Sequence, residues 1–257
     1  MLILVTGGTG VLGRHVVRVL RERGHVPRVL SRRPPNVQGM VRGDLATGAG
    51  LSEAVAGVDG IIHAASATTE PWRYRSTDVA GTGRLLEAAR AAAVPHLLYI
   101  SIAGMEGIPY PYYRYKLRAE TLVREGGVPW SILRATQFPE LIEVFLGGFS
   151  LVPGLILVPY EWRFQVVHAA EVAVRLVDVV EGAPAGRVPD FGGPAPRRME
   201  DLARSWRNAR HSRRRIARLP LAGRVHRAFS AGRLLVPDGV HGTRTWEDWL
   251  GERYGHA

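Results

Sequence analysis

Short apolar runs alternate with amphipathic stretches along the first half of the chain. Apolar residues recur every three to four positions in the stretches, which predicts helices, whereas the runs are continuous and predict buried strands. We expect strands at 2–6, 26–31, 60–66, 96–101 and 130–135, with helices at 10–23, 77–93 and 112–125. Strands separated by helices of this length are typical of βαβ units. Right-handed crossovers then predict an α/β fold with a doubly wound parallel sheet.

The second half of the chain is less regular. We expect helices at 138–147 and 169–181, a strand at 162–168, and a loop or sheet edge in the Pro- and Gly-rich stretch 182–196. Arginine-rich material that we expect to be helical follows. We interpret residues 1–257 as a single domain, in which residues of about 138–160 and 193–257 form a small C-terminal substrate-side cap.

Composition excludes several classes of protein. The 257 residues are 46% hydrophobic, enough for a full core, and the absence of cysteine excludes disulfides, thiolate metal sites and a cysteine nucleophile. The most apolar segment, Leu146–Tyr160, holds two prolines and three glycines, so no transmembrane segment is expected. The apolar start "MLILV" has no basic residues before it, unlike a signal peptide. We therefore expect a cytoplasmic protein without a metal site.

The net charge of +11 admits nucleic acid, anionic lipid or a phosphorylated ligand as a partner. Much of this charge lies in Arg197–Arg227, which has 11 arginines and two acidic residues. No zinc-finger spacing or RNA-binding aromatic motif accompanies them, so a nucleic acid partner is not favoured. We interpret the segment as the solvated face of a helix or, alternatively, as a groove for an anionic ligand.

A glycine-rich turn joins the first expected strand to the first expected helix. Its glycines, three residues apart, permit a tight turn and a close approach of backbone to a pyrophosphate, while the helix N-terminus offers free N–H groups. This context predicts a Rossmann-type dinucleotide site. The residues concerned are Thr6, Gly7, Gly8, Thr9, Gly10, Val11, Leu12 and Gly13.

The end of the second expected strand indicates which dinucleotide is bound. A carboxylate there would bind the ribose hydroxyls of NAD and repel a 2′-phosphate. This strand instead ends in Ser31, Arg32 and Arg33, which can donate hydrogen bonds to a phosphate. NADP (NADPH) is therefore favoured over NAD.

The chain contains a single lysine, Lys116, and it lies four residues after Tyr112 on an expected helix. An adjacent ammonium lowers the pKa of a tyrosine, and such a tyrosine serves as a general acid or base. Ser101 ends the preceding expected strand, where its hydroxyl can orient a substrate oxygen. In the alternative interpretation, Lys116 binds only the cofactor ribose and Tyr112 lines a pocket.

These motifs, in this order, resemble the short-chain dehydrogenase/reductase superfamily, in its extended and atypical branches, and most of all the NmrA-like NAD(P)-binding proteins. The resemblance covers about residues 2 to 175 and rests on "TGGTGVLG" (6–13), "GDL" (43–45), "HAAS" (63–66), "DVAGTGRLLEAA" (78–89), "YISIAG" (99–104), "YYRYK" (112–116), "ILRATQF" (132–138) and "VVHAAEVA" (166–173). It implies that Asp44, followed by Leu45, contacts the adenine, that Ala64 and Ala65 line the cofactor, and that Ser101, Tyr112 and Lys116 are catalytic. A homodimer is common in the superfamily.

Three hypotheses of function follow. The first is an NADP-dependent oxidoreductase that transfers hydride between nicotinamide and a carbonyl, quinone or alcohol of a mostly apolar small molecule. The second is a nucleotide-sugar epimerase or dehydratase, in which the C-terminal arginines meet a diphosphate. The third is a non-catalytic NmrA-like NADP redox sensor, since a fold does not by itself define an activity.

Overall fold

The computed structural model describes residues 1–34 and 39–255, which group into two compact units. Unit 1 contains Met1–Ser101, Tyr110–Arg134 and Val172–Pro189, and unit 2 contains Ile102–Pro109, Ala135–Glu171 and Asp190–Ala257. The prediction of a substrate-side cap at about 138–160 and 193–257 stays a prediction.

Unit 1 is built on a parallel sheet, as the apolar pattern predicted. The strand order is β3-β2-β1-β4-β5-β6, with β9 also pairing with β6. The bounds are β1 Leu2–Thr6, β2 Val26–Ser31, β3 Met40–Arg42, β4 Gly60–His63, β5 Leu97–Ile102, β6 Trp130–Ala135 and β9 Gly186–Arg187. Reversal of the strand order beside β1 creates the crevice in which folds of this kind bind ligands.

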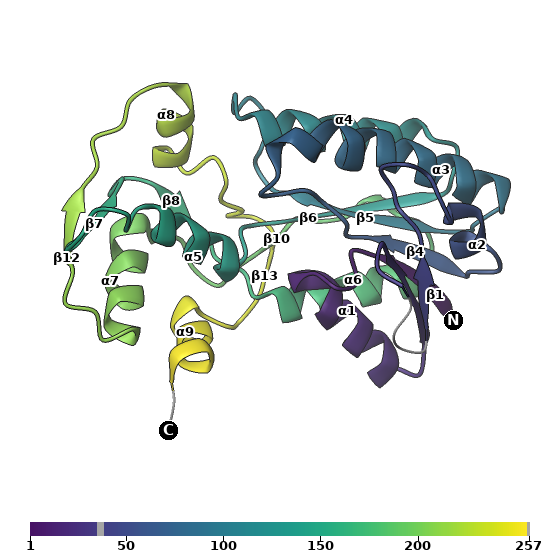
Figure 1. The fold of residues 1–257 in the computed structure, drawn as a ribbon, viewed down its shortest axis with the longest axis horizontal. Helices are drawn as coiled ribbons and strands as arrows, with labels where there is room; N and C mark the ends of the chain where they lie inside the picture. The colour runs from purple at the N-terminus through teal and green to yellow at the C-terminus, as the bar shows by residue number, and fades with distance from the viewer. Residues whose placement is uncertain (35–38, 256–257) are drawn as a thin grey trace. The chain divides into compact units, whose positions relative to one another are not determined.

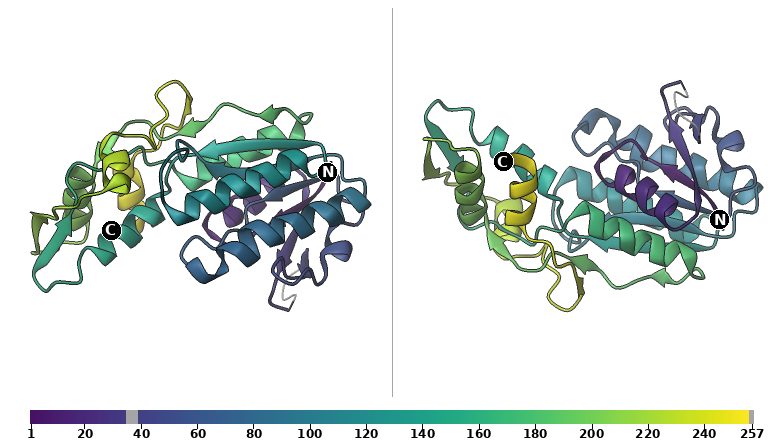
Figure 2. Two further views of the ribbon diagram at one scale, coloured as in Figure 1. Left: turned by 90° about the horizontal axis from the view of Figure 1, so that it is seen from above. Right: turned by 90° about the horizontal axis from the view of Figure 1, so that it is seen from below.

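Helices cover both faces of this sheet. The bounds are α1 Val11–Glu22, α2 Leu51–Val55, α3 Gly81–Ala91, α4 Pro111–Glu125 and α6 Ala169–Glu181, with a short 3₁₀ turn Pro71–Arg73 and a π-helical turn Tyr74–Ala80 before α3. Helices α3 and α4 lie on one face, and α1 and α6 lie on the other (Figures 1 and 2). Side chains of α2, α3 and α4 pack on the sheet in one apolar cluster that includes Leu4, Ile61, Leu97 and Ile132.

Most predicted elements of the first half are confirmed within a few residues, and the differences are local. The strand expected at 60–66 ends at His63, and residues 64–67 line the cavity described below. The helix expected at 77–93 is preceded by the π-helical turn, which already begins at Tyr74. Strand β3 and helix α2 were not predicted, because at three and five residues both are too short to show a period.

Unit 2 consists of short strands and helices. The bounds are α5 Pro139–Gly148, β7 Leu155–Val158, β8 Arg163–Phe164, β10 Phe191–Gly192, β11 Arg197–Arg198, α7 Met199–Ala209, β12 Arg215–Arg218, α8 Arg224–Ser230, β13 Val240–His241 and α9 Trp246–Tyr254. The strand expected at 162–168 is only two residues long, and beyond it the Gln165 side chain donates to Gly193 O and accepts from the Val236 N–H. Part of the arginine-rich segment expected to be helical is the strand β12, which pairs with β7.

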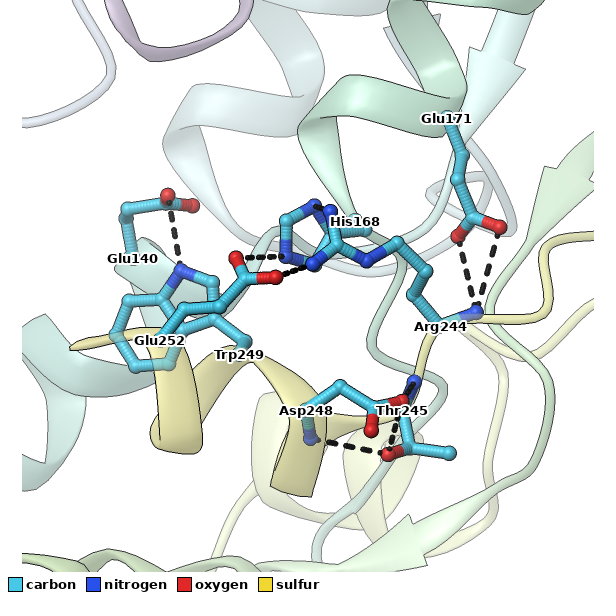
Figure 3. A network of polar contacts seen from close by, with 8 residues as sticks. All are labelled: Glu140, His168, Glu171, Arg244, Thr245, Asp248, Trp249 and Glu252. Carbon is cyan, nitrogen blue, oxygen red and sulfur yellow. Dashed lines mark hydrogen bonds and ion pairs between the residues drawn. The ribbon is translucent and has the colours of Figure 1, made fainter. Parts of the chain in front are cut away.

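A polar network fixes the C-terminal helix within unit 2 (Figure 3). Helix α9 begins with a capping box, in which Thr245 and Asp248 exchange hydrogen bonds. The Glu171 carboxylate accepts from the backbone N–H of Arg244, whose guanidinium pairs with Glu252. Trp249 donates to Glu140 at 3.3 Å, so charged groups and a buried ring together hold this helix in place.

Among the described residues, no helix is long and apolar enough to cross a membrane. That part of the chain also contains no group of three His, Asp or Glu side chains placed to hold a metal ion.

Candidate functional site

The predicted phosphate loop has the backbone that its glycines imply. Gly7 has φ of 70°, and a Cβ there would lie 2.7 Å from the backbone nitrogen of Ala65. A Cβ on Gly13 would lie 2.1 Å from the Gly7 oxygen, so the loop closes tightly on the start of α1. Gly10 precedes that helix without a side-chain cap, which leaves the first N–H groups of α1 available to an anion.

A cavity of about 410 Å³ opens beside this loop in unit 1. It gathers ten of the residues predicted to bind the cofactor: Gly7, Thr9, Gly10, Ser31, Arg32, Arg33, Asp44, Leu45, Ala64 and Ala65. Because these come from the ends of β1, β2, β3 and β4, the sheet brings together segments that are far apart in the sequence.

The other predicted cofactor residues shape this site without lining the cavity. Thr6 and Leu12 are buried, Gly8 packs against Val29 and Val11 is the first residue of α1. Lys116 does not line the cavity either. Sequence analysis missed Leu30, Gly43, Ser66, Ala67, Glu70, Arg73 and Thr77. Five of the missed residues lie between β4 and α3: Ser66 and Thr77 are the end residues of the strand expected at 60–66 and the helix expected at 77–93, and Ala67, Glu70 and Arg73 lie between the two.

Two polar residues at the cavity edge are already held by local backbone bonds. Ser31 Oγ accepts from the Arg33 N–H at 3.1 Å, and Asp44 Oδ1 accepts from the Ala46 N–H at 2.8 Å. These bonds fix both turns. Arg32 and Arg33 are exposed at the same edge, so two guanidinium groups stand where the second strand ends.

His63 ties the end of β4 to its neighbours. Its Nε2 lies 2.9 Å from Thr82 Oγ1, which gives its own proton to Asp78 O, so Nε2 is the protonated nitrogen. Nδ1 then accepts from Thr6 Oγ1 at 2.6 Å. Burial above all, followed by the charge of Lys116, lowers the pKa of His63 to about 3. A neutral, fully bonded histidine of this kind serves structure rather than proton transfer.

Tyr112 lies at the end of a hydrogen-bond chain that reaches a buried carboxylate. Its hydroxyl is 2.7 Å from Ser66 Oγ and 3.1 Å from Thr68 Oγ1, and Ser66 donates to Asp78 Oδ1 at 2.5 Å. A serine hydroxyl has one proton. Since Ser66 gives it to Asp78, Tyr112 donates to Ser66 and accepts from Thr68.

The pKa of Tyr112 is raised above its usual value, first by burial and then by the negative charge of Asp78. The expectation that Lys116 lowers this pKa is therefore wrong for this arrangement. The Lys116 ammonium instead donates to Tyr99 OH at 2.6 Å and to Ile100 O at 2.9 Å. Burial lowers the pKa of Lys116 to about 8, so it stays mostly protonated at neutral pH.

Ser101 follows Ile100 on β5 and is 4% exposed. Within residues 1–34 and 39–255, its Oγ finds no hydrogen-bond partner. A buried hydroxyl without a partner costs free energy, which a substrate oxygen or another ligand atom would recover. The residues present thus fit a bound dinucleotide, and Ser101 offers a hydroxyl to a further ligand.

The parallel sheet, the glycine loop and the adjoining cavity define a dinucleotide-binding protein of the Rossmann type. A family model described as NAD(P)H-binding matches residues 7–140, and the chain belongs to this family. Its relatives are of the extended short-chain dehydrogenase/reductase and NmrA-like type, which confirms the resemblance drawn from the motifs.

The chain is 34% identical over 192 residues to ceramide reductase of Caulobacter vibrioides, a match that covers 68% of this chain and 59% of that protein. It is also 34% identical over 148 residues to 3-beta-hydroxysteroid dehydrogenase of Mycolicibacterium neoaurum, covering 47% and 40%. The chain thus spans about half the length of these curated relatives. Among solved structures, a short-chain dehydrogenase/reductase superfamily protein from Agrobacterium tumefaciens with bound NAD has a TM-score of 0.73 at 22% identity, covering 99% and 96%. This last likeness shows the fold.

Proposed function

We propose that this protein is an NADP-dependent oxidoreductase that transfers hydride between nicotinamide and a carbonyl, quinone or alcohol carbon of a mostly apolar small molecule. The observation that carries the proposal is the hydroxyl of Tyr112, whose proton is directed along Ser66 to Asp78. The names of two relatives, a ceramide reductase and a steroid dehydrogenase, support both the reaction and an apolar substrate.

Each residue has a distinct role in this proposal. The bound nicotinamide supplies or accepts the hydride. Ser101 orients the substrate oxygen with its unpartnered hydroxyl. Lys116 holds the ribose with the ammonium proton that is not donated to Tyr99 or Ile100. Tyr112 exchanges a proton with that oxygen.

The hydrogen-bond chain from Tyr112 through Ser66 to Asp78 provides the route for the proton that leaves or reaches the substrate oxygen. In alcohol oxidation the substrate proton passes to the Tyr112 oxygen, the Tyr112 proton passes to Ser66, and the Ser66 proton passes to the Asp78 carboxylate. Carbonyl reduction runs in reverse from a state in which Asp78 has taken a proton from solvent: the Asp78 proton passes to Ser66, the Ser66 proton to Tyr112, and the Tyr112 proton to the substrate oxygen. Because the pKa of Tyr112 is raised, the residue remains protonated at neutral pH and so carries the proton that reduction requires.

The test is the loss of NADPH absorbance against a panel of quinones, aromatic ketones and aldehydes. Tyr112→Phe should lower turnover by about 10²-fold or more and leave NADPH binding unchanged. Tyr115→Phe, on the same helix, is the matched control and should retain turnover. Equal turnover in wild type and Tyr112→Phe would remove Tyr112 from the mechanism.

The preference for NADP is tested separately by dissociation constants. Arg32 and Arg33 line the cavity where a 2′-phosphate would be bound, and a charge-assisted hydrogen bond contributes about 1.5–3 kcal/mol. Arg32→Ala should weaken NADPH binding by about tenfold and hardly change NADH binding. Equal affinities of wild type for the two cofactors would contradict the assignment.

One observation favours the redox-sensor alternative. The Lys116 ammonium donates to Tyr99 and Ile100 and not to Tyr112. In this arrangement Lys116 can contribute to cofactor binding without assisting proton transfer by Tyr112. A sensor would bind a protein partner differently with NADPH and NADP, and this difference would persist in Tyr112→Phe.

A further inference from the structure

Unit 2 contains a long segment with no charged residue. Between Glu143 and Glu161 the sequence "VFLGGFSLVPGLILVPY" has no Asp, Glu, Arg or Lys. It forms the end of α5, an exposed turn and the strand β7. Exposed turns usually lie at the surface in contact with water and are polar. The apolar composition of the turn between α5 and β7 therefore needs an explanation.

A second segment of unit 2 has the opposite character. Residues 202–237 contain ten arginines and neither Asp nor Glu. It includes most of α7, the strand β12 and the helix α8. Arg204 pairs with Glu200 and Arg218 with Glu161, but the arginines outnumber these carboxylates, and an excess of positive charge attracts an anionic surface.

The fold brings the two segments together, because β7 and β12 pair in parallel with Leu155 opposite Arg215 (Figure 1). The turns that precede both strands therefore meet at one end of the pair. The Arg215 N–H donates to Gly154 O at 2.9 Å, and the Arg214 guanidinium donates to Ser150 O. We call residues 151–154 and 213–215 the β7–β12 tip.

Apolar side chains at the β7–β12 tip point into open space. Leu151 is 83% exposed and Val152 is 42% exposed. A Cβ on Gly154 would meet no atom within 4 Å. Arg213 and Arg215, at the start of the neighbouring strand, are also exposed. The tip thus combines uncovered apolar groups with guanidinium groups at the same end of two strands.

We propose that the β7–β12 tip docks on an anionic lipid bilayer. Leu151 and Val152 enter the boundary between headgroups and acyl chains, and Arg213, Arg214 and Arg215 bind lipid phosphates at the headgroup level. Charge complementarity selects this occupant. A nucleic acid would match the arginines but would leave Leu151 exposed to water, and a second copy of the chain would bring like charges together. The proposal is independent of the catalytic role of Tyr112.

The experiment is co-sedimentation of the full chain with vesicles of phosphatidylcholine alone or with about one third phosphatidylglycerol. We expect binding to the anionic vesicles that weakens as salt rises from about 0.1 to 1 M, because salt screens exposed charges. The double variant Leu151→Asp/Val152→Asp should lower partitioning by about tenfold or more. Arg213→Glu/Arg215→Glu should lower it by a similar factor, since each arginine near the surface contributes about fivefold.

Two variants in unit 1 serve as matched controls, Val26→Asp for the apolar change and Arg118→Glu for the charge change. Val26 is 60% exposed, and Arg118 is exposed on α4. Both should bind vesicles as wild type does. The proposal would be overturned if the chain did not bind anionic vesicles, or if it bound neutral vesicles equally well. It would also be overturned if the Leu151→Asp/Val152→Asp variant bound vesicles as wild type does. A fourth contrary result is a chain that binds no vesicles but self-associates, with the self-association lost in this variant.

Discussion

The two units differ in their buried charges. Besides exposed ion pairs such as Arg18 with Glu22, unit 1 contains charged groups that are buried and hydrogen-bonded: Glu120 with Arg134, Lys116 with Tyr99 and Asp78 with Ser66. In unit 2 the ion pairs lie at the surface, as between Arg197 and Glu247. A charged group that is buried costs free energy unless it is hydrogen-bonded, and those bonds fix its position, whereas exposed pairs contribute little and tolerate change. Unit 1 is therefore suited to hold reacting groups, and unit 2 to offer an adaptable surface.

The largest effect should come from breaking the buried pair of unit 1. Arg134 donates to both oxygens of Glu120, at 2.8 and 2.6 Å, and both side chains are 7% exposed or less. Glu120→Gln leaves a buried guanidinium without its counter-charge and should lower the unfolding free energy by about 3–5 kcal/mol. Urea denaturation measures this. A loss below about 1 kcal/mol would show that the pair is not desolvated as described.

The next effect concerns the phosphate loop. Gly7→Ala should weaken NADPH binding by about 10- to 100-fold, because strain at a positive φ and contact with Ala65 move the loop. Gly24→Ala is the matched control. Gly24 also has positive φ, of 77°, but it meets no atom within 4 Å. Titration of both variants with NADPH checks this. If both variants lost affinity for NADPH to a similar extent, backbone strain alone would explain the effect, and contact with Ala65 would not be needed.

A third effect depends on pH. Because the folded pKa of His63 is about 3 and the ordinary value is 6.5, the unfolded chain takes up a proton there first. This contribution to stability is complete above pH 6.5 and is lost as the pH falls towards 3, at about 1.4 kcal/mol per pH unit. Unfolding of wild type and His63→Gln between pH 7 and 4 tests this. Parallel pH profiles would contradict it.

The smallest effect should come from unit 2. Arg197 and Glu247 form a pair with side chains 36% and 45% exposed. Glu247→Gln should change the unfolding free energy by less than about 1 kcal/mol, measured in the same urea series as Glu120→Gln. A loss as large as that of Glu120→Gln would remove the contrast between the units.

How far the sequence predicts the site depends on how local the signal is. The glycine loop, the strand that ends at Ser31, and the spacing of Tyr112 and Lys116 are local patterns, and the structure places each on the expected element. Ser66 and Asp78 lie in two of the motifs that carry the resemblance, "HAAS" and "DVAGTGRLLEAA", but no local pattern assigned either residue to the site. They meet Tyr112 only through a π-helical turn and a loop, and neither has a periodic pattern.

The sequence by itself determined the parallel sheet and the phosphate loop of this protein, because apolar period and glycine geometry act over a few residues. Only the tertiary structure decided which group each polar side chain binds. Tyr112 and Lys116 share a helix face, yet Lys116 bonds Tyr99, and Tyr112 bonds Ser66. Likewise, Arg215–Arg218 of the arginine-rich segment form a strand through their pairing with β7, which is distant in the sequence. Hydrogen-bond partners distant in sequence are selected by packing, which no local pattern encodes.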